Sequence, residues 1–191
     1  MADDNGRSTN VKPMIKPARR AADTAPMVDG ALRDIMARFA TGVTVLSAPG
    51  TCGHAMTANA FTSVSLDPPL VLCCVARPAR FHESVLCARS FGVSVLAADQ
   101  QDVAGYFADK RRPQGLAQFD AVDWVAGPHT GSPLLVGALA WLECSLVKVH
   151  DGGDHSIFVG QVLSSSRSAD AKALLFYGGG YHHVTPPGLS A

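Results

Sequence analysis

The stretch from residue 132 to 167 constrains the fold most, because it predicts two long strands joined by a tight turn. Its sequence, SPLLVGALAWLECSLVKVHDGGDHSIFVGQVLSSSR, has two apolar arms with a fair alternation of apolar and polar residues. That alternation is typical of half-buried strands. Between the arms stands Asp151-Gly152-Gly153, and glycine supplies the positive φ that a hairpin turn needs. The chain must therefore contain an antiparallel pair of strands.

Four further strands are predicted upstream of this hairpin, and no regular helical crossovers separate them. They are expected at residues 43–48, 54–65, 70–76 and 91–97. Short helices are expected near residues 28–39, at 80–88 and at 99–109. Residues 110–124 are expected to form a long irregular loop, a kind of segment that is usually functional or mobile. The pattern predicts a mainly β protein, an antiparallel barrel of about six strands with a few short helices.

The composition is that of a globular protein and excludes two classes of partner. The 191 residues are 47% hydrophobic and 17% charged, and sixteen basic residues balance sixteen acidic ones. Nucleic-acid binding would need a basic excess, and a membrane span would need about eighteen consecutive apolar residues. We expect neither nucleic acid nor membrane as a partner. We expect a flexible tail over residues 1–27, one domain over 28–184 and a second tail over 185–191.

The cysteines and histidines give no sign of a disulfide framework or a metal site. The chain contains five cysteines: Cys52, Cys73, Cys74, Cys87 and Cys144. Their number is odd, no Cys-x-x-Cys spacing occurs, and the first residues lack the apolar segment of a secretory signal. We therefore expect reduced, mostly buried thiols and a cytoplasmic location. The adjacent His182 and His183 have no third ligand at a suitable spacing, so no metal is expected.

Residues 54–82 carry more hydroxyl and amide groups than a strand usually does. The sequence MTANAFTSVS alternates such groups, and Arg77 and Arg80 follow the next predicted strand where a short helix begins. A strand edge and an amide can hydrogen-bond a planar ring, hydroxyls can bind a polyol, and arginine binds phosphate. No GxGxxG or GxxxxGK[ST] motif occurs, so a phosphate site here would be neither Rossmann-like nor a P-loop. From residue types alone, an ordinary solvent-facing strand remains the alternative.

Four segments, which span roughly residues 30–184, have a specific order and spacing. They are FATGVTVLSA…HAMTANAFTSVSLDPPLVLCCV, FGVSVLAADQQDVAGYFA, GSPLLVGALAWLECSLVKVHDGGDHSIFVGQV and LLFYGGGYHHV. In this order they resemble the short-chain flavin reductases, which supply reduced flavin to two-component monooxygenases. The resemblance implies a six-stranded antiparallel split β-barrel with Greek-key topology, assembled as a homodimer. It also implies an NAD(P)H:flavin oxidoreductase, in which NADH or NADPH reduces FMN or FAD for a partner monooxygenase.

The resemblance also implies, position by position, which residues bind the two ligands. Flavin would be contacted by Met56, Thr57, Ala58, Asn59, Ser63, Val75, Ala76, Arg80 and Phe81. The nicotinamide would be contacted by His155, Tyr177, Gly178, Gly179 and Tyr181. Arg77 and Pro78 depart from the family's pattern, so phosphate binding is expected to depend on Arg80. Hydride transfer depends mainly on the positions of the two rings, so His155 is expected to be a catalytic residue that positions them.

Three alternatives stay open on the sequence alone. The first is a flavin-binding electron-transfer protein of the same fold that does not turn over. The second is a split-barrel oxidase or a reductase that uses a deazaflavin, and the third is a structural dimer without a ligand. The sequence also leaves open the choice between FMN and FAD and between NADH and NADPH.

Overall fold

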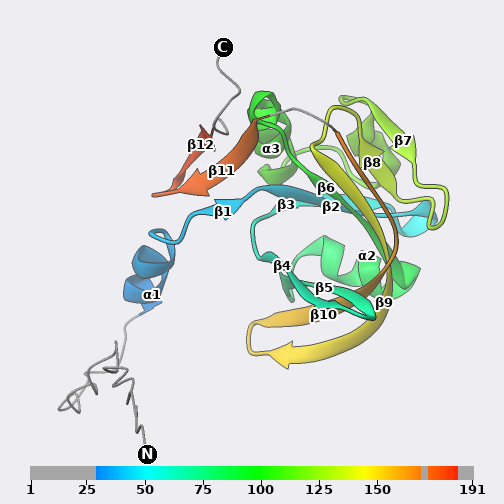
Figure 1. The fold of residues 1–191 in the computed structure, drawn as a ribbon, viewed down its shortest axis with the longest axis horizontal. Helices are drawn as coiled ribbons and strands as arrows, with labels where there is room; N and C mark the ends of the chain where they lie inside the picture. Colours follow the sequence, from blue (N-terminus) through cyan, green and yellow to red (C-terminus); the bar gives the residue numbers. More distant parts are fainter. Residues whose placement is uncertain (1–28, 169–171, 185–191) are drawn as a thin grey trace, which may run out of the picture. The chain divides into compact units, whose positions relative to one another are not determined.

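The computed structural model describes residues 29–168 and 172–184 of the chain (Figure 1). The tails expected at residues 1–27 and 185–191 therefore lie outside the described residues. The chain divides after Met36 into two units. The first holds helix α1 (Asp29–Met36), where a helix is predicted. The second, from Ala37 onward, holds the described strands and the candidate site.

The second unit consists mainly of antiparallel strands with a few helices, which confirms the mainly β prediction. Its largest sheet has seven strands in the order β3-β2-β6-β9-β10-β5-β4, and each neighbouring pair is antiparallel. Figure 1 shows this sheet curving around helix α2 (Arg80–Ala88). The strands of the sheet are β2 (Thr44–Ala48), β3 (His54–Ala58), β4 (Phe61–Leu66), β5 (Pro69–Ala76), β6 (Ser90–Val95), β9 (Ala140–Gly152) and β10 (His155–Arg167).

The sheet has seven strands instead of six because the strand predicted at 54–65 is two strands. β3 ends at Ala58 and pairs with β2, whereas β4 begins at Phe61 and pairs with β5. Asn59 and Ala60 between them are exposed, and the two strands stand at opposite ends of the sheet order. Within the described residues no pairing joins β3 to β4, so the sheet has two free edges.

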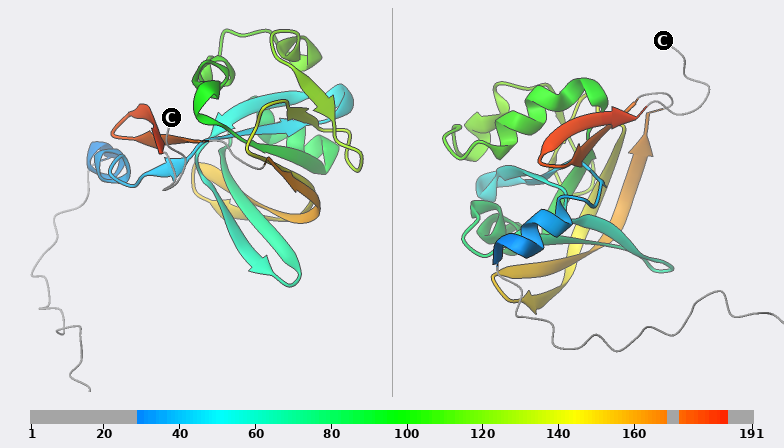
Figure 2. Two further views of the ribbon diagram at one scale, coloured as in Figure 1. Left: turned by 45° about the horizontal axis from the view of Figure 1, so that its top comes forward. Right: turned by 90° about the vertical axis from the view of Figure 1, so that its left-hand side faces the viewer.

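The hairpin predicted between residues 132 and 167 is confirmed, and β9 and β10 are its two arms. Gly153 in the turn has a φ of +76°, and its N–H donates to Asp151 Oδ1 at 2.8 Å. β10 also pairs with β5, and β9 with β6, so the hairpin forms the middle of the sheet. Figure 2 shows its two arms from further directions.

Shorter elements complete the second unit. The helix predicted at 99–109 is present as α3 (Gln101–Ala108), preceded by the 3₁₀ turn η2 (Ala98–Gln100). The segment expected as a loop over 110–124 contains the 3₁₀ helix η3 (Gly115–Phe119). The remaining elements are β1 (Thr41–Gly42), β11 (Ala173–Tyr177) and β12 (Gly180–Val184) in one sheet, β7 (Trp124–Ala126) and β8 (Pro133–Leu135) in another, and the 3₁₀ turn η1 (Gly50–Cys52).

Two clusters of buried apolar side chains fix the helices against the sheet. Phe81 and Val85 of α2 are fully buried in the first cluster, which also contains Phe91 and Phe158 of the sheet. The second cluster packs Phe107 of α3 and other aromatic and aliphatic residues against the opposite side of β2 and β3. Each large side chain removed from water contributes about 1.5–3 kcal/mol. The two helices that flank β3 are therefore held firmly by the core.

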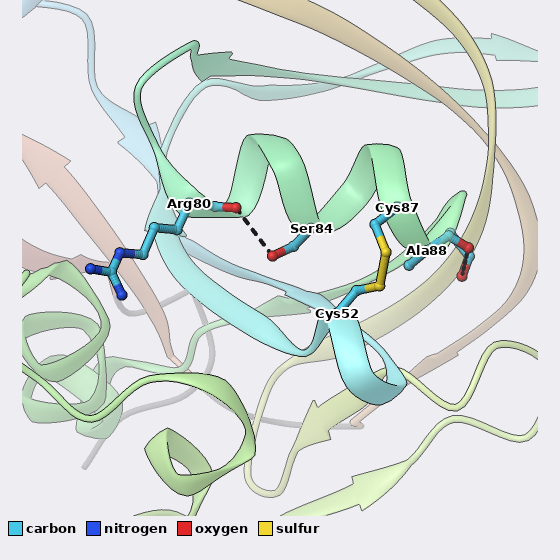
Figure 3. Close-up of a disulfide and its surroundings, with 6 residues drawn as sticks. Cys52, Arg80, Ser84, Cys87 and Ala88 are labelled. Atoms are coloured by element: carbon cyan, nitrogen blue, oxygen red, sulfur yellow. Dashed lines mark hydrogen bonds between the residues drawn. A yellow bond between two sulfur atoms is a disulfide. The ribbon is translucent and has the colours of Figure 1, made fainter.

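The expectation of five reduced cysteines is wrong for one pair, because a disulfide joins Cys52 to Cys87. Cys52 ends η1 and Cys87 lies in the last turn of α2, and their Cα atoms are 6.2 Å apart (Figure 3). The two residues are 35 positions apart in the sequence. They meet only because α2 packs against the connection between β2 and β3, which no local spacing reveals. Cys73 and Cys144 are buried free thiols, as expected.

Candidate functional site

A cavity of about 560 Å³ lies between β3, the beginning of α2 and the segment that follows α3. This volume is typical of small-molecule sites, which range from about 300 to 1,000 Å³. Five of the predicted flavin residues line it: Met56, Thr57, Ala76, Arg80 and Phe81. The other lining residues are His54, Pro78, Ala79, Phe107, Ala108, Lys110, Arg112 and Gln114.

A second cavity of about 250 Å³ adjoins the first, because Thr57 and Ala108 line both. It brings together three more of the predicted residues, Ala58, Asn59 and Tyr181. Its remaining wall consists of Val43 and Phe176. The two cavities together follow β3 over most of its length, so one elongated ligand could occupy both.

The two cavities lie beside a free strand edge. β3 stands at one end of the sheet order, and on its free side the Ala55 N–H donates to Gln118 Oε1 at 3.0 Å. The Ala55 carbonyl accepts a hydrogen bond from Arg112 Nη2. Because the backbone groups of alternate residues face the same edge of a strand, the N–H and C=O of Thr57 face this edge too. They supply one donor and one acceptor where the two cavities meet.

The hydroxyl of Thr57 forms a hydrogen bond within the protein. Its Oγ1 donates to the carbonyl oxygen of Ala104 in α3 at 2.6 Å. This hydrogen bond attaches α3 to β3. The backbone N–H and C=O of Thr57 are still available to hydrogen-bond a ligand.

Among the described residues, three cationic side chains and no carboxylate line the larger cavity. Arg80 comes from the first turn of α2, and Lys110 and Arg112 come from the segment that follows α3. Figure 3 shows the Arg80 side chain extending from α2 away from the disulfide near the other end of the helix. Cations without acidic partners around a cavity are suited to an anionic ligand, above all a phosphate.

Arg112 is half-buried and holds the segment after α3 against β3. Its Nε donates to Gln118 Oε1 at 3.3 Å, its Nη1 to the Asp109 carbonyl at 2.7 Å, and its Nη2 to the Ala55 carbonyl. Its guanidinium carbon also lies 5.8 Å from the centre of the Phe107 ring, within cation–π distance. These contacts fix the position of a positive charge in the cavity wall.

His54 in the same wall is held in its neutral form. Burial, followed by the charges of Arg112 and Arg80, lowers the pKa of His54 to about 4. Its two ring nitrogens each lie 3.2 Å from a group that can only donate, Arg112 Nη2 and Gln118 Nε2. A protonated ring would face both donors with N–H groups, so His54 adds no fourth positive charge to the cavity.

Two predicted flavin residues line neither cavity. Val75 in β5 is fully buried, so only its main chain is near the site, through its neighbour Ala76. Ser63 is exposed on β4, at the other end of the sheet order.

Arg77, for which no role was assigned, forms an ion pair with Asp151 at 3.0 Å and donates to the Gly153 carbonyl at 2.9 Å. It thus ties the end of β5 to the turn of the long hairpin.

The predicted nicotinamide residues come from two hairpins, β9–β10 and β11–β12. His155 begins β10, with its backbone paired to Ala76, and its Nδ1 lies 2.7 Å from Asp154 Oδ1. Tyr177, Gly178 and Gly179 form the exposed turn between β11 and β12. Of the predicted nicotinamide residues, only Tyr181 lines a cavity.

Sequence reasoning missed eight lining residues of the larger cavity, among them His54, Phe107, Lys110 and Arg112. The basic run Lys110-Arg111-Arg112 is visible in the sequence and follows a predicted helix directly. Three consecutive basic residues at this place predict a site for an anionic ligand. Which of these residues face the cavity depends on the path of the chain after α3, and the sequence does not give that path.

The described part of the chain contains neither a cluster of metal ligands nor a helix that could span a membrane. Residues 29–168 and 172–184 contain no group of three or more His, Cys, Asp or Glu side chains arranged to hold a metal ion. None of the helices in these ranges is both long and apolar enough to cross a membrane.

Comparison with known proteins gives the family. Residues 36–185 match the model of the flavin reductase like domain. The structure of BorF, the flavin reductase component of a bacterial two-component tryptophan halogenase, is 52% identical, with a TM-score of 0.79 over 82% of this chain and 98% of BorF. The NADH:FAD oxidoreductase SgcE6 of Streptomyces globisporus, solved with NAD and FAD fragments, is 43% identical, with a TM-score of 0.80 over 88% of this chain and 99% of SgcE6.

A further relative is a subunit of a monooxygenase system. The reductase subunit HsaB of a flavin-dependent monooxygenase from Rhodococcus jostii is 37% identical over 155 residues, which are 81% of this chain and 77% of HsaB. On the family model, these relatives and the shared fold, the chain belongs to the flavin reductase like family.

Proposed function

We propose that this chain is an NAD(P)H:flavin oxidoreductase that reduces FMN or FAD and releases the reduced flavin to a partner monooxygenase. The observation that carries the proposal is a cavity with three cations and no carboxylate beside a free strand edge. The cations suit a phosphate, and the edge suits a planar ring with donors and acceptors on its rim. SgcE6 with its NAD and FAD fragments and the HsaB reductase subunit support the same activity.

In this proposal the flavin lies along β3 with its phosphate at α2. Arg80 and Phe81 hold the phosphate end, and the ring lies against the strand. The residues beside the ring are Met56, Thr57, Ala58 and Asn59, and Ser63, Val75 and Ala76 complete the site. The cavity lining supports all of these assignments except Ser63 and Val75, which the family resemblance alone suggests.

The protein's part in the reaction is mainly to position the two rings. When bound, flavin accepts a hydride from the nicotinamide of NADH or NADPH. We assign the nicotinamide to His155, Tyr177, Gly178, Gly179 and Tyr181. The contact of His155 Nδ1 with Asp154 orients the imidazole and leaves Nε2 available to a ligand. Asp154 is 91% exposed, so this contact orients the ring without adding much stability.

Three further proposals concern the whole protein. Residues 28–184 form the functional domain, and the seven-stranded sheet corresponds to the split β-barrel of the family. Two copies associate as a homodimer in the cytoplasm. Exposed apolar side chains on neighbouring hairpins support association, among them Leu66, Val147 and Val149. A molar mass of one chain by light scattering at micromolar concentration would contradict the dimer.

The activity is tested by following NADH and NADPH oxidation with FMN, FAD or riboflavin in large excess over the protein. We expect many turnovers per chain, because each reduced flavin leaves and is replaced. A non-turnover electron carrier would stop after about one equivalent, and that result would reject the proposed function. Exchanging the nucleotides and flavins in turn identifies the preferred pair.

A further inference from the structure

Among the described residues, Arg112 forms no salt bridge with a carboxylate, although it is half-buried. The acceptors of its hydrogen bonds are the neutral oxygens of Ala55, Asp109 and Gln118. The nearest carboxylate, that of Asp109, is engaged by Arg111 through the backbone N–H, Nε and Nη2 at 2.8–3.2 Å. A half-buried guanidinium without a counter-ion is costly, unless a ligand provides the negative charge.

The same guanidinium faces a cavity that already contains other cations. Arg80 and Lys110 line the cavity together with Arg112. Burial is the main reason why the pKa of Arg112 is lowered; Tyr106 and Asp109 offset part of this effect, and the charge of Arg80 lowers the pKa further. The two guanidinium groups are thus close enough to repel each other. An anion bound between them would be attracted to both guanidinium groups, and this attraction would offset their mutual repulsion.

The hydrogen bonds of Arg112 leave it one donor for such an anion. A guanidinium has five N–H groups, and three of those on Arg112 donate to protein oxygens, one each from Nε, Nη1 and Nη2. The second N–H of Nη2 points toward His54. The second N–H of Nη1 has no protein partner among the described residues. The side chain is therefore held in place before any ligand arrives, which lowers the entropic cost of binding.

We propose that Arg112 is a ligand-binding residue that, with Arg80 and Lys110, binds the phosphate of the flavin. This proposal rests on the proposed function and adds a second arm to the phosphate site. Arg80 reaches the phosphate from α2, and Arg112 reaches it from the segment after α3. The same residue joins that segment to β3 through Ala55, so phosphate binding and the attachment of the segment to β3 depend on one side chain.

The test compares Arg112→Gln with Arg111→Gln. Arg111 is the neighbouring arginine, its side chain is 90% exposed, and it does not line the cavity, so it is a matched control for the loss of one charge. Dissociation constants for riboflavin, FMN and FAD are measured by flavin fluorescence without nucleotide. A charge-assisted hydrogen bond contributes about 1.5–3 kcal/mol, so Arg112→Gln should weaken FMN and FAD binding about ten- to a hundredfold. Riboflavin, which has no phosphate, should change less than about threefold. Arg111→Gln should match the wild type.

Three outcomes would overturn the proposal. In the first, Arg112→Gln binds FMN and FAD as tightly as the wild type. In the second, riboflavin binding weakens as much as FMN binding, which would assign Arg112 a purely structural role in the segment. In the third, the KM for NADH rises while flavin affinity is unchanged, which would assign the residue to the phosphates of the nucleotide.

A second variant separates the charge of Arg112 from its shape. Arg112→Lys keeps a cation but loses the planar fork that contacts Ala55 and Gln118. It should retain part of the preference for FMN over riboflavin, and a preference as low as that of Arg112→Gln would contradict a charge interaction. Failure of the proposed function is a different result, because the wild type would then neither bind flavin nor oxidise NADH.

Discussion

Individual residues in the larger cavity have charges that their surroundings determine. His54 and Arg112 lie in one wall and share contacts with Gln118, yet one is neutral and the other is a cation. The difference follows from chemistry, because an imidazole can lose its proton in the physiological range, whereas a guanidinium cannot. The wall therefore presents a fixed pattern of charge to a ligand over a wide range of pH.

The pKa of about 4 for His54 predicts how stability depends on pH. Between pH 6.5 and 4 the unfolded chain binds a proton at this residue, whereas the folded chain does not. Lowering the pH through this window therefore favours unfolding, and the loss levels off below pH 4. Because the ring is only half-buried, we expect a loss of about 1–2 kcal/mol, less than the full shift implies.

The measurement is an NMR titration of the histidine ring protons. One imidazole should stay neutral down to about pH 4. His54→Gln identifies the signal, and urea unfolding of this variant should depend less steeply on pH between 6.5 and 4 than that of the wild type. A ring at position 54 that titrates near 6.5 would contradict the prediction.

The packing between secondary-structure elements depends on close approaches that allow no extra atom. Gly160 in β10 lies under the ring of Phe91 in β6, and a Cβ at this position would be 2.5 Å from Phe91 Cζ and 3.0 Å from Cys144 Cβ. Phe91 is fully buried, so its ring has no space into which it could move. The glycine is thus required by the contact between two strands.

Gly160→Ala is expected to lower the free energy of unfolding by about 1–3 kcal/mol, the usual cost of overpacking a core. Gly105→Ala is the matched control, because a Cβ on this helical glycine in α3 meets nothing within 4 Å. It should raise stability by about 0.5–1 kcal/mol through helix propensity. Urea denaturation measures both changes, and equal stability of the two variants would argue against the close contact.

The Cys52–Cys87 disulfide joins η1 to α2, and the first residues of α2 line the larger cavity. η1 leads directly into β3, and α2 begins with Arg80 and Phe81 (Figure 3). Closing a loop of 35 residues stabilises a fold by at most about 4 kcal/mol through the entropy of the unfolded chain. The bond therefore contributes to overall stability and holds α2 to the segment that leads into β3.

Reduction of this bond should lower the free energy of unfolding by about 2–4 kcal/mol. Denaturation curves with and without dithiothreitol measure the effect. The double variant Cys52→Ser, Cys87→Ser should have the same free energy of unfolding in both conditions. A thiol assay on the unfolded, unreduced protein should find three free cysteines: Cys73, Cys74 and Cys144. Five thiols in protein purified without reductant would contradict the bond.

At the scale of the whole molecule, the sequence predicted those secondary-structure elements that depend on residues close together in the chain. The hairpin at Gly153, helix α2 and the polar strand β3 follow from turn chemistry, apolar spacing and residue types near in the chain. The separation of β3 from β4 was missed, because it depends on which partners the strands find across the sheet. The bond of Arg112 to Ala55, 57 positions away, likewise depends on the assembled fold.

The free edge of β3 has a consequence for the protein when no ligand is bound. An uncovered edge is a template for strand addition by another chain, and native proteins usually protect such edges. Here Gln118 and Arg112 cover the edge at Ala55, but Thr57 lies beside the cavities without such cover. A flat ring seated there would occupy the remaining positions. Bound flavin would then protect the edge from other chains, so the protein should precipitate later during storage when FMN or FAD is added.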